Sequence, residues 1–156
     1  MPNMVGARGF VNSSAKHREY FILLEEEMRE DRVFGYLLTM DLYGVEPVKC
    51  QDLNLGYEFL DSLPGHIGMH KQSLPHIYIT PPQWLGKKGL SGWVGLVESG
   101  IQLHTLSENG FVSVDLYTCS FIDQILVPEI LEFVSRYYPY REVETNLLKR
   151  GLKYNN

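Results

Sequence analysis

The dipeptide Asn109-Gly110 constrains this sequence most, because it lies between two runs of alternating residues, 100–106 and 111–118. A type I′ turn needs positive φ at both central residues, and Asn-Gly accepts this at little cost. The sequence therefore predicts an antiparallel hairpin. The expected pairs are Ile101 with Thr118, Leu103 with Leu116 and Thr105 with Val114 on one face, and Gly100 with Cys119, Gln102 with Tyr117 and His104 with Asp115 on the other.

The first face of this hairpin is apolar or β-branched and is expected to be buried. The second face would let Asp115 orient His104 and would place Cys119 beside Ser99. In a regular strand, however, Ser99 points to the face opposite His104, and the sequence contains no Gly-x-Ser-x-Gly elbow. A conventional serine hydrolase is therefore disfavoured.

The remaining elements follow from periodicity and from Gly and Pro positions. Residues 1–16 read as a flexible leader, and residues 17–156 as a single domain. Helices are expected at 17–32, at 51–63 up to Pro64-Gly65, and from Pro128 onward; strands are expected at 33–43, 76–80, 90–97, 100–106, 111–118 and 142–148. Strands and helices that do not alternate regularly indicate an α+β fold, a two-layer sandwich of a mostly antiparallel sheet with helices on one face.

Composition narrows the class of protein. With 156 residues, 44% hydrophobic and 21% charged, the chain is typical of one globular domain. A formal charge of −5 argues against nucleic acid as a partner. No apolar run approaches the roughly 20 residues that a membrane helix needs. Two cysteines and no signal-like N-terminus indicate a reducing, cytoplasmic setting.

The segment LSGWVGLVESGIQLHTLSENGFVSVDLYTC, residues 90–119, resembles the core of the prokaryotic S-adenosylmethionine decarboxylase proenzymes. These self-processing enzymes make their own pyruvoyl cofactor. The family pattern has a Ser-Gly pair, Glu-Ser at the cleavage point, and then a His and a Cys at fixed distances. The matching residues are Ser91-Gly92, Glu98-Ser99, His104 and Cys119.

The resemblance implies cleavage between Glu98 and Ser99. The Ser99 hydroxyl would attack the Glu98 carbonyl to give an ester, His104 would assist the elimination that follows, and Ser91 would support processing. Hydrolysis of the resulting dehydroalanine leaves a pyruvoyl group derived from Ser99.

The resemblance also implies the chemistry of the mature enzyme. The pyruvoyl group would form a Schiff base with the substrate amine, and Cys119 would return a proton after CO2 is lost. The implied assembly is a homodimer of processed protomers that takes a small amino-acid-type substrate in polyamine (spermidine) biosynthesis.

The sequence departs from the family pattern at two places, which leaves three functional interpretations. Gly100 replaces the histidine that usually follows the serine at the cleavage point, and Leu106-Ser107 replaces an aromatic-proline pair. S-adenosylmethionine is favoured as the substrate, with Trp84 as an aromatic face for it. L-ornithine or L-arginine is the alternative, with Glu108 as an acidic partner. An unprocessed, non-catalytic paralogue that acts as an interaction subunit is the third interpretation.

A metal site is not expected. His66 and His70 have the spacing of ligands on a helix, but Pro64-Gly65 and Gly68 disfavour a helix there, and no Cys or carboxylate cluster completes a site.

Overall fold

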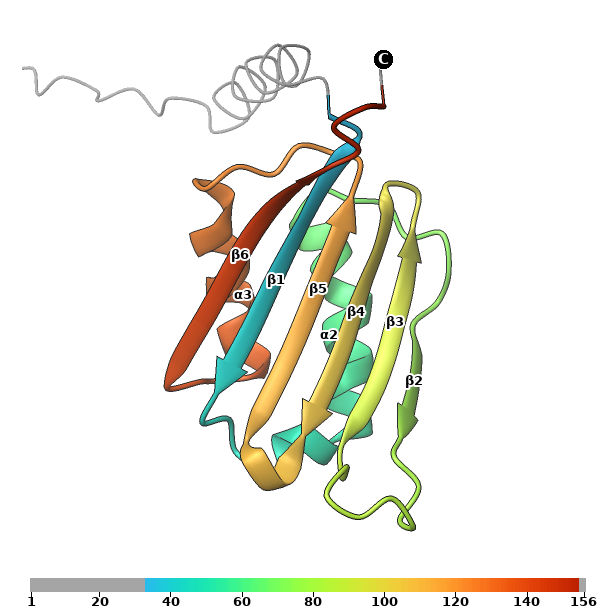
Figure 1. The fold of residues 1–156 in the computed structure, drawn as a ribbon. Coiled ribbons are helices and arrows are strands. Elements are labelled where there is room, and N and C mark those ends of the chain that lie inside the picture. Colours follow the sequence, from blue (N-terminus) through green and yellow to red (C-terminus); the bar gives the residue numbers. More distant parts are fainter. Residues whose placement is uncertain (1–32, 155–156) are drawn as a thin grey trace, which may run out of the picture. The chain divides into compact units, whose positions relative to one another are not determined.

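The computed structural model describes residues 33–154, which form a six-stranded sheet with two helices (Figure 1). Its strand order is β2-β3-β4-β5-β1-β6, and all neighbouring strands are antiparallel. The strands are β1 (Gly35–Tyr43), β2 (His76–Ile79), β3 (Leu90–Leu96), β4 (Ser99–Leu106), β5 (Phe111–Thr118) and β6 (Glu142–Arg150), and the helices are α2 (Leu53–His66) and α3 (Leu126–Tyr137). Both helices lie on the same face of the sheet. The predicted α+β two-layer sandwich is confirmed.

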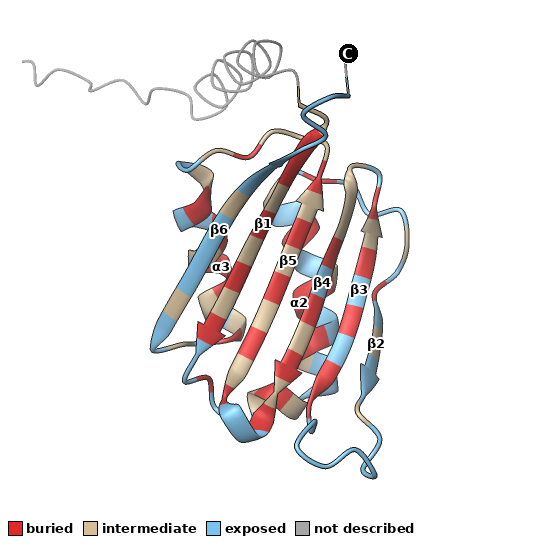
Figure 2. Cartoon of the chain, in the orientation of Figure 1, coloured by how far each residue is buried: buried red, intermediate tan, exposed pale blue. Residues whose placement is uncertain are grey.

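The core lies between this helical layer and the sheet, and burial alternates along the central strands (Figure 2). Val112, Val114 and Leu116 of β5 are fully buried, whereas the residues between them are only half-buried. Because successive strand residues point to opposite faces, the half-buried set marks a second face that no described helix covers. We call this second face the open face.

The β4–β5 hairpin forms, but its expected register is wrong by two residues. Asn109 is the last residue of a 3₁₀ turn, η2 (Ser107–Asn109), and Gly110 follows with φ of 57°. Buried Ser107 donates through its N–H and its hydroxyl to the Lys88 carbonyl (2.8 and 3.0 Å), which widens the connection. A shift of two residues keeps every side chain on its expected face, because the side-chain period of a strand is also two.

The boundaries of helix α2 differ from those expected. Asp52 caps its start by accepting a hydrogen bond from the Leu55 N–H (3.0 Å). The helix does not stop at Pro64 but continues to His66, and the Ile67 N–H still donates to the Leu63 carbonyl. A proline in the last turn removes only its own donor, so the turn can close around it.

The other boundaries lie close to the predicted ones. A second 3₁₀ turn, η1 (Lys49–Gln51), precedes α2. Pro128 lies in the first turn of α3 as expected, and β6 extends two residues beyond the predicted 142–148. The expected leader 1–16 and the expected helix 17–32 lie outside the described residues.

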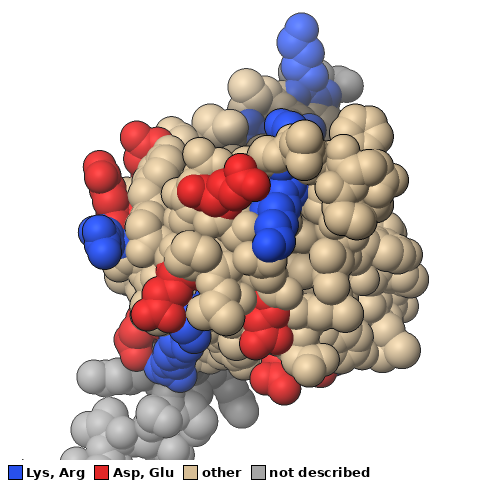
Figure 3. All heavy atoms as spheres, turned by 90° about the horizontal axis from the view of Figure 1, so that it is seen from below, with Lys and Arg blue, Asp and Glu red and all other residues tan. Residues whose placement is uncertain are grey.

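Two surface properties bear on possible partners. None of the helices in the described region is both long and apolar enough to cross a membrane. Acidic and basic side chains are interspersed on the face seen in Figure 3, which shows no continuous basic patch of the kind that binds nucleic acid.

Candidate active site

The expected cleavage point lies at a tight turn between β3 and β4. Leu96 pairs with Ser99, so Val97 and Glu98 alone connect the two strands. Two-residue hairpins usually adopt turns with positive φ at one or both central residues. Here Ser99 carries the positive φ instead, at 145°, and it is the only non-glycine residue between 33 and 154 that does so. Such a conformation costs about 1–3 kcal/mol and persists only where neighbouring contacts enforce it.

The backbone carbonyl of Glu98 accepts a hydrogen bond from the Cys119 N–H (2.8 Å). Cys119 therefore lies beside the cleavage point, as predicted. Its strand position is different from the predicted one, because Thr118 pairs with Ser99 and Tyr117 pairs with Gly100. The Cys119 thiol is free and half-buried.

The side chain of Glu98 is held by His70, a contact that the sequence did not predict. One carboxylate oxygen accepts the His70 backbone N–H (3.0 Å), and the other lies 2.7 Å from His70 Nδ1. Partial burial raises the pKa of the Glu98 carboxyl, but the hydrogen bonds from the His70 ring and backbone outweigh it and hold that pKa below its ordinary value. Glu98 is therefore ionised at neutral pH.

Ser91 and His104 form a second pair on the open face. They are directly opposite each other across β3 and β4, and the Ser91 hydroxyl donates to His104 Nδ1 (2.8 Å) when the imidazole proton is on Nε2. The expected pairing of His104 with Asp115 is wrong, because Ser113 lies opposite His104 and Asp115 lies opposite Gln102. Ser91 is thus the residue that orients His104.

These two groups of residues are far apart within one chain. Ser99 and His104 are five residues apart on β4, which corresponds to about 16 Å along a strand. The sequence interpretation placed the serine, the histidine and the cysteine together. The structure brings Cys119 to Ser99 and Ser91 to His104, but it does not bring the two pairs together.

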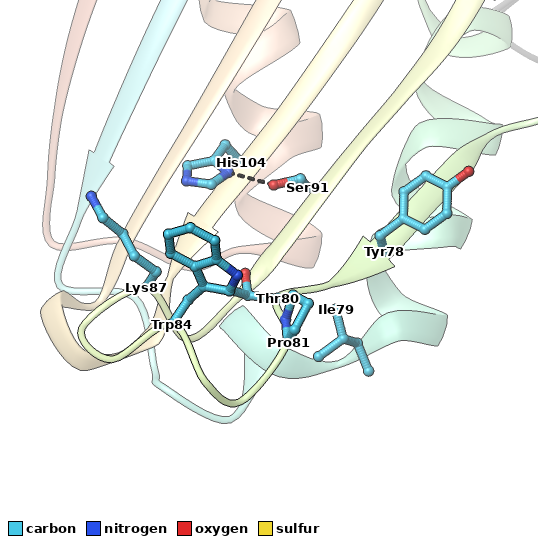
Figure 4. Close-up of a pocket in the computed structure, with 8 residues that line it drawn as sticks. All are labelled: Tyr78, Ile79, Thr80, Pro81, Trp84, Lys87, Ser91 and His104. Atoms are coloured by element: carbon cyan, nitrogen blue, oxygen red, sulfur yellow. Dashed lines mark hydrogen bonds between the residues drawn. The ribbon is translucent and has the colours of Figure 1, made fainter.

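A pocket of about 320 Å³ lies beside the Ser91–His104 pair (Figure 4). The indole of Trp84 comes from the loop between β2 and β3, and the Ser91–His104 pair comes from the sheet. The pocket is lined by Tyr78, Ile79, Thr80, Pro81, Trp84, Lys87, Ser91 and His104. Glu108 is exposed in η2 and is not among these residues. The structure therefore places Trp84, but not Glu108, at this pocket.

Sequence reasoning missed His70, Lys87 and the aromatic residues around Trp93. His70 was considered only as a metal ligand with His66, and the described residues contain no group of three or more His, Cys, Asp or Glu side chains that could hold a metal ion. His76 and Tyr78 both lie against Trp93, at 5.2 and 5.9 Å between ring centroids. No local motif signals these contacts, since strand pairing creates them.

Comparisons with known proteins point to one family. The family model for S-adenosylmethionine decarboxylase matches residues 36–151. An S-adenosylmethionine decarboxylase proenzyme from Persephonella marina is 26% identical over 121 residues, which are 78% of this chain and 85% of that protein. The proenzyme of the same name from Aquifex aeolicus is 27% identical over 121 residues, 78% of this chain and 84% of that protein.

A solved structure is also similar. The crystal structure of the adenosylmethionine decarboxylase from Aquifex aeolicus superposes with a TM-score of 0.63 at 27% identity. The match covers 76% of this chain and 92% of that one.

Proposed function

This chain belongs to the S-adenosylmethionine decarboxylase family, and we propose that it cleaves itself between Glu98 and Ser99 to become a pyruvoyl-dependent decarboxylase of S-adenosylmethionine. One observation carries the proposal. Ser99 has a φ of 145° beside a Glu98 carbonyl that accepts the Cys119 N–H, so the residue after the bond to be broken is strained and the carbonyl of that bond is polarised.

The strain favours the first step of self-cleavage. When the Ser99 hydroxyl attacks the Glu98 carbonyl carbon, the bond from that carbon to the Ser99 nitrogen breaks, the hydroxyl proton passes to that nitrogen, and an ester with a free amine forms. The freed nitrogen no longer fixes φ at Ser99, so the cost of that conformation is relieved. The Cys119 N–H is already directed at the oxygen that gains negative charge during the attack, which is the role of an oxyanion-hole donor.

The same residues fit a pyruvoyl group at position 99. Its carbonyl supplies the electron sink that decarboxylation of an amino acid requires. Cys119 is half-buried, and its backbone N–H bonds to the carbonyl of the preceding residue, Glu98, so its thiol is the candidate to donate the proton that replaces CO2. Both cysteines are free thiols, which fits the expected cytoplasmic setting.

His104 can serve this site only from a second copy of the chain. Within one chain, about 16 Å of strand separates it from Ser99. The open face that carries Ser91 and His104 also exposes large apolar side chains, among them Trp93, Tyr78 and Leu148. A homodimer that packs this face against a second copy would bury these side chains and could bring the Ser91–His104 pair of one protomer to Ser99 of its partner.

The pocket favours S-adenosylmethionine over a diamino acid. The side-chain ammonium of ornithine, or the guanidinium of arginine, needs an acidic partner, yet none of the eight residues that line the pocket is Asp or Glu. An aromatic face such as that of Trp84 suits an adenine ring and a sulfonium cation.

The test combines mass with activity. Purified protein should consist of chains 1–98 and 99–156, and the Ser99→Ala variant should remain whole. CO2 release should be fastest with S-adenosylmethionine when it is compared with ornithine and arginine. A chain that stays intact and releases no CO2 would instead support the non-catalytic paralogue, and faster release from ornithine or arginine would overturn the substrate assignment.

A further inference from the structure

We propose that His70 is a positioning residue for self-cleavage, which holds the Glu98 side chain so that Ser99 stays in its strained conformation. We call the pair of contacts from His70 to the Glu98 carboxylate the His70 clamp. The proposal rests on the self-cleavage proposed above, and it adds a residue that lies outside the 90–119 segment.

The His70 clamp uses two donors on two different oxygens. The backbone N–H of His70 donates to Glu98 Oε2 (3.0 Å), and the ring atom Nδ1 lies 2.7 Å from Oε1. The His70 carbonyl in turn accepts the Val97 N–H (2.9 Å). His70 therefore contacts both residues of the turn that precedes Ser99: Val97 through its backbone carbonyl, and Glu98 through its backbone N–H and its ring.

The segment that carries His70 is itself fixed to the end of β3. Lys71 forms a bridge with Leu96 and an ion pair with Asp61 of α2. The N–H groups of Gln72 and Ser73 both donate to the Gly95 carbonyl (2.8 and 3.2 Å), and the Ser73 hydroxyl accepts the Gly95 N–H (2.9 Å). A segment held at this many points gives the clamp a rigid base.

Glu98 is consequently held on two sides. Its side chain is bound to His70, and its carbonyl is bound to the Cys119 N–H. If the side chain were released, residue 98 could rotate and let φ of Ser99 relax, so that the strain that favours the attack would be lost. Strained conformations persist where surrounding contacts over-determine them, and the His70 clamp supplies one of those contacts.

The two side chains of the His70 clamp differ in their exposure to solvent. The Glu98 side chain is 16% exposed, whereas that of His70 is 77% exposed. Removing the ring therefore deletes few packing contacts, and its effect on the fold should be small. The ring is thus positioned to act on Glu98 without being part of the core.

The experiment follows cleavage of the full chain in real time. Cell-free translation with a labelling pulse gives the rate at which chain 1–156 converts to 1–98 and 99–156. His70→Ala should slow this conversion by about three- to tenfold, the effect expected from losing a charge-assisted contact that is partly exposed. His70→Asn offers an N–H close to the position of Nδ1 and should restore the rate to within about twofold of wild type.

Two controls separate positioning from a general loss of structure. His66→Ala removes an exposed histidine that stacks on Phe133 and should leave the rate unchanged. In a Glu98→Ala background, His70→Ala should cause no further slowing, because the clamp has no carboxylate to hold. Melting temperatures measured in the uncleavable Ser99→Ala background should agree within a few degrees with and without His70→Ala.

The outcomes are distinguishable. A wild-type chain that cleaves while His70→Ala cleaves equally fast overturns the clamp alone, as does slowing that persists in the Glu98→Ala background. A wild-type chain that never cleaves overturns the proposed self-cleavage and the clamp together.

Discussion

The cleavage turn at Glu98-Ser99 and the pocket beside His104 differ in how they are built. Hydrogen bonds from backbone N–H groups of Cys119 and His70 shape the cleavage turn. The pocket is shaped by side chains: a serine and a histidine from adjacent strands, and a tryptophan from a loop. The turn stores strain in one φ angle, whereas the pocket has no positive φ except at Gly86 in its loop.

This difference indicates that the turn is suited to self-cleavage and the pocket to binding a small molecule. Backbone donors set by a sheet register are rigid, so they suit a reaction in which the chain attacks its own peptide bond. Exposed side chains around a cavity suit recognition of a small molecule. Because about 16 Å of strand separates Ser99 from His104, the homodimer proposed above is the arrangement that would combine both regions in one site.

The largest expected effect tests whether the two regions meet across two chains. Ser99→Ala and His104→Ala should each reduce cleavage at least about 100-fold when expressed alone. Co-expressed with different tags, they form mixed dimers in which one site has both an intact Ser99 and an intact His104. Mass spectrometry should then detect cleavage of a measurable fraction of the His104→Ala chains. If these chains stay whole in the mixture, the two regions do not combine in trans.

A second substitution distinguishes the role of the Cys119 backbone N–H from that of the Cys119 thiol. Cys119→Ala keeps the N–H that bonds to the Glu98 carbonyl, so cleavage should continue within about threefold of the wild-type rate. Decarboxylation should fall by about 10²- to 10⁴-fold, because the thiol proton donor is lost. Cleavage is measured by intact mass and decarboxylation by CO2 release. Equal loss of both activities would show that the thiol also serves processing.

A third substitution affects only the pocket. Trp84→Ala should raise KM for S-adenosylmethionine by about five- to tenfold through loss of the aromatic face, with little change in self-cleavage. Trp84→Phe keeps an aromatic ring and should recover most of the affinity. Steady-state kinetics on fully processed protein check this, and an unchanged KM for Trp84→Ala would remove Trp84 from the substrate site.

The smallest expected effect concerns Asp115, which lies between the two regions on the open face. Burial, and then the nearby charge of Asp41, raise the pKa of the Asp115 carboxyl. A folded-state pKa above the unfolded value means that the ionised form destabilises the fold, so Asp115→Asn should stabilise it near pH 7. Allowing for solvent screening, the gain is about 0.5 kcal/mol or less.

The pH dependence distinguishes this cause from a packing effect. The advantage of Asp115→Asn should shrink as the pH falls through the raised pKa, and it should vanish once both the folded and unfolded forms of Asp115 are protonated. Urea unfolding at several pH values measures this difference. An advantage that stays constant down to low pH would contradict the electrostatic cause.

Periodicity predicted most of the fold. The alternation in 111–118 places Val112, Val114 and Leu116 in the core, as the structure confirms. Turn chemistry was less informative, since Asn109-Gly110 is a strong signal for a two-residue turn, yet Ser107 donates to the Lys88 carbonyl and widens the connection. That contact joins residues far apart in the sequence, which no local pattern encodes.

The sequence named several residues of the candidate site, but not how they are arranged. The spacing of Ser91, Glu98-Ser99, His104 and Cys119 pointed to one family, and the comparisons confirm that family. The partner of His104 was assigned to Asp115 from the β4–β5 hairpin alone, whereas the β3–β4 pairing supplies Ser91. His70 was unpredictable as a partner of Glu98, because 28 positions separate the two residues.

The sequence by itself determined the family of this protein, which faces of its strands are buried, and that the sheet carries helices on one side. These properties depend on local composition and on periods of two or about 3.6 residues. Only the tertiary structure decided that Ser99 is strained and that His70 holds Glu98. It also decided that His104 lies too far from Ser99 to reach it within one chain. Strand register and strand order fix those relations, and both depend on contacts between residues that are distant in sequence.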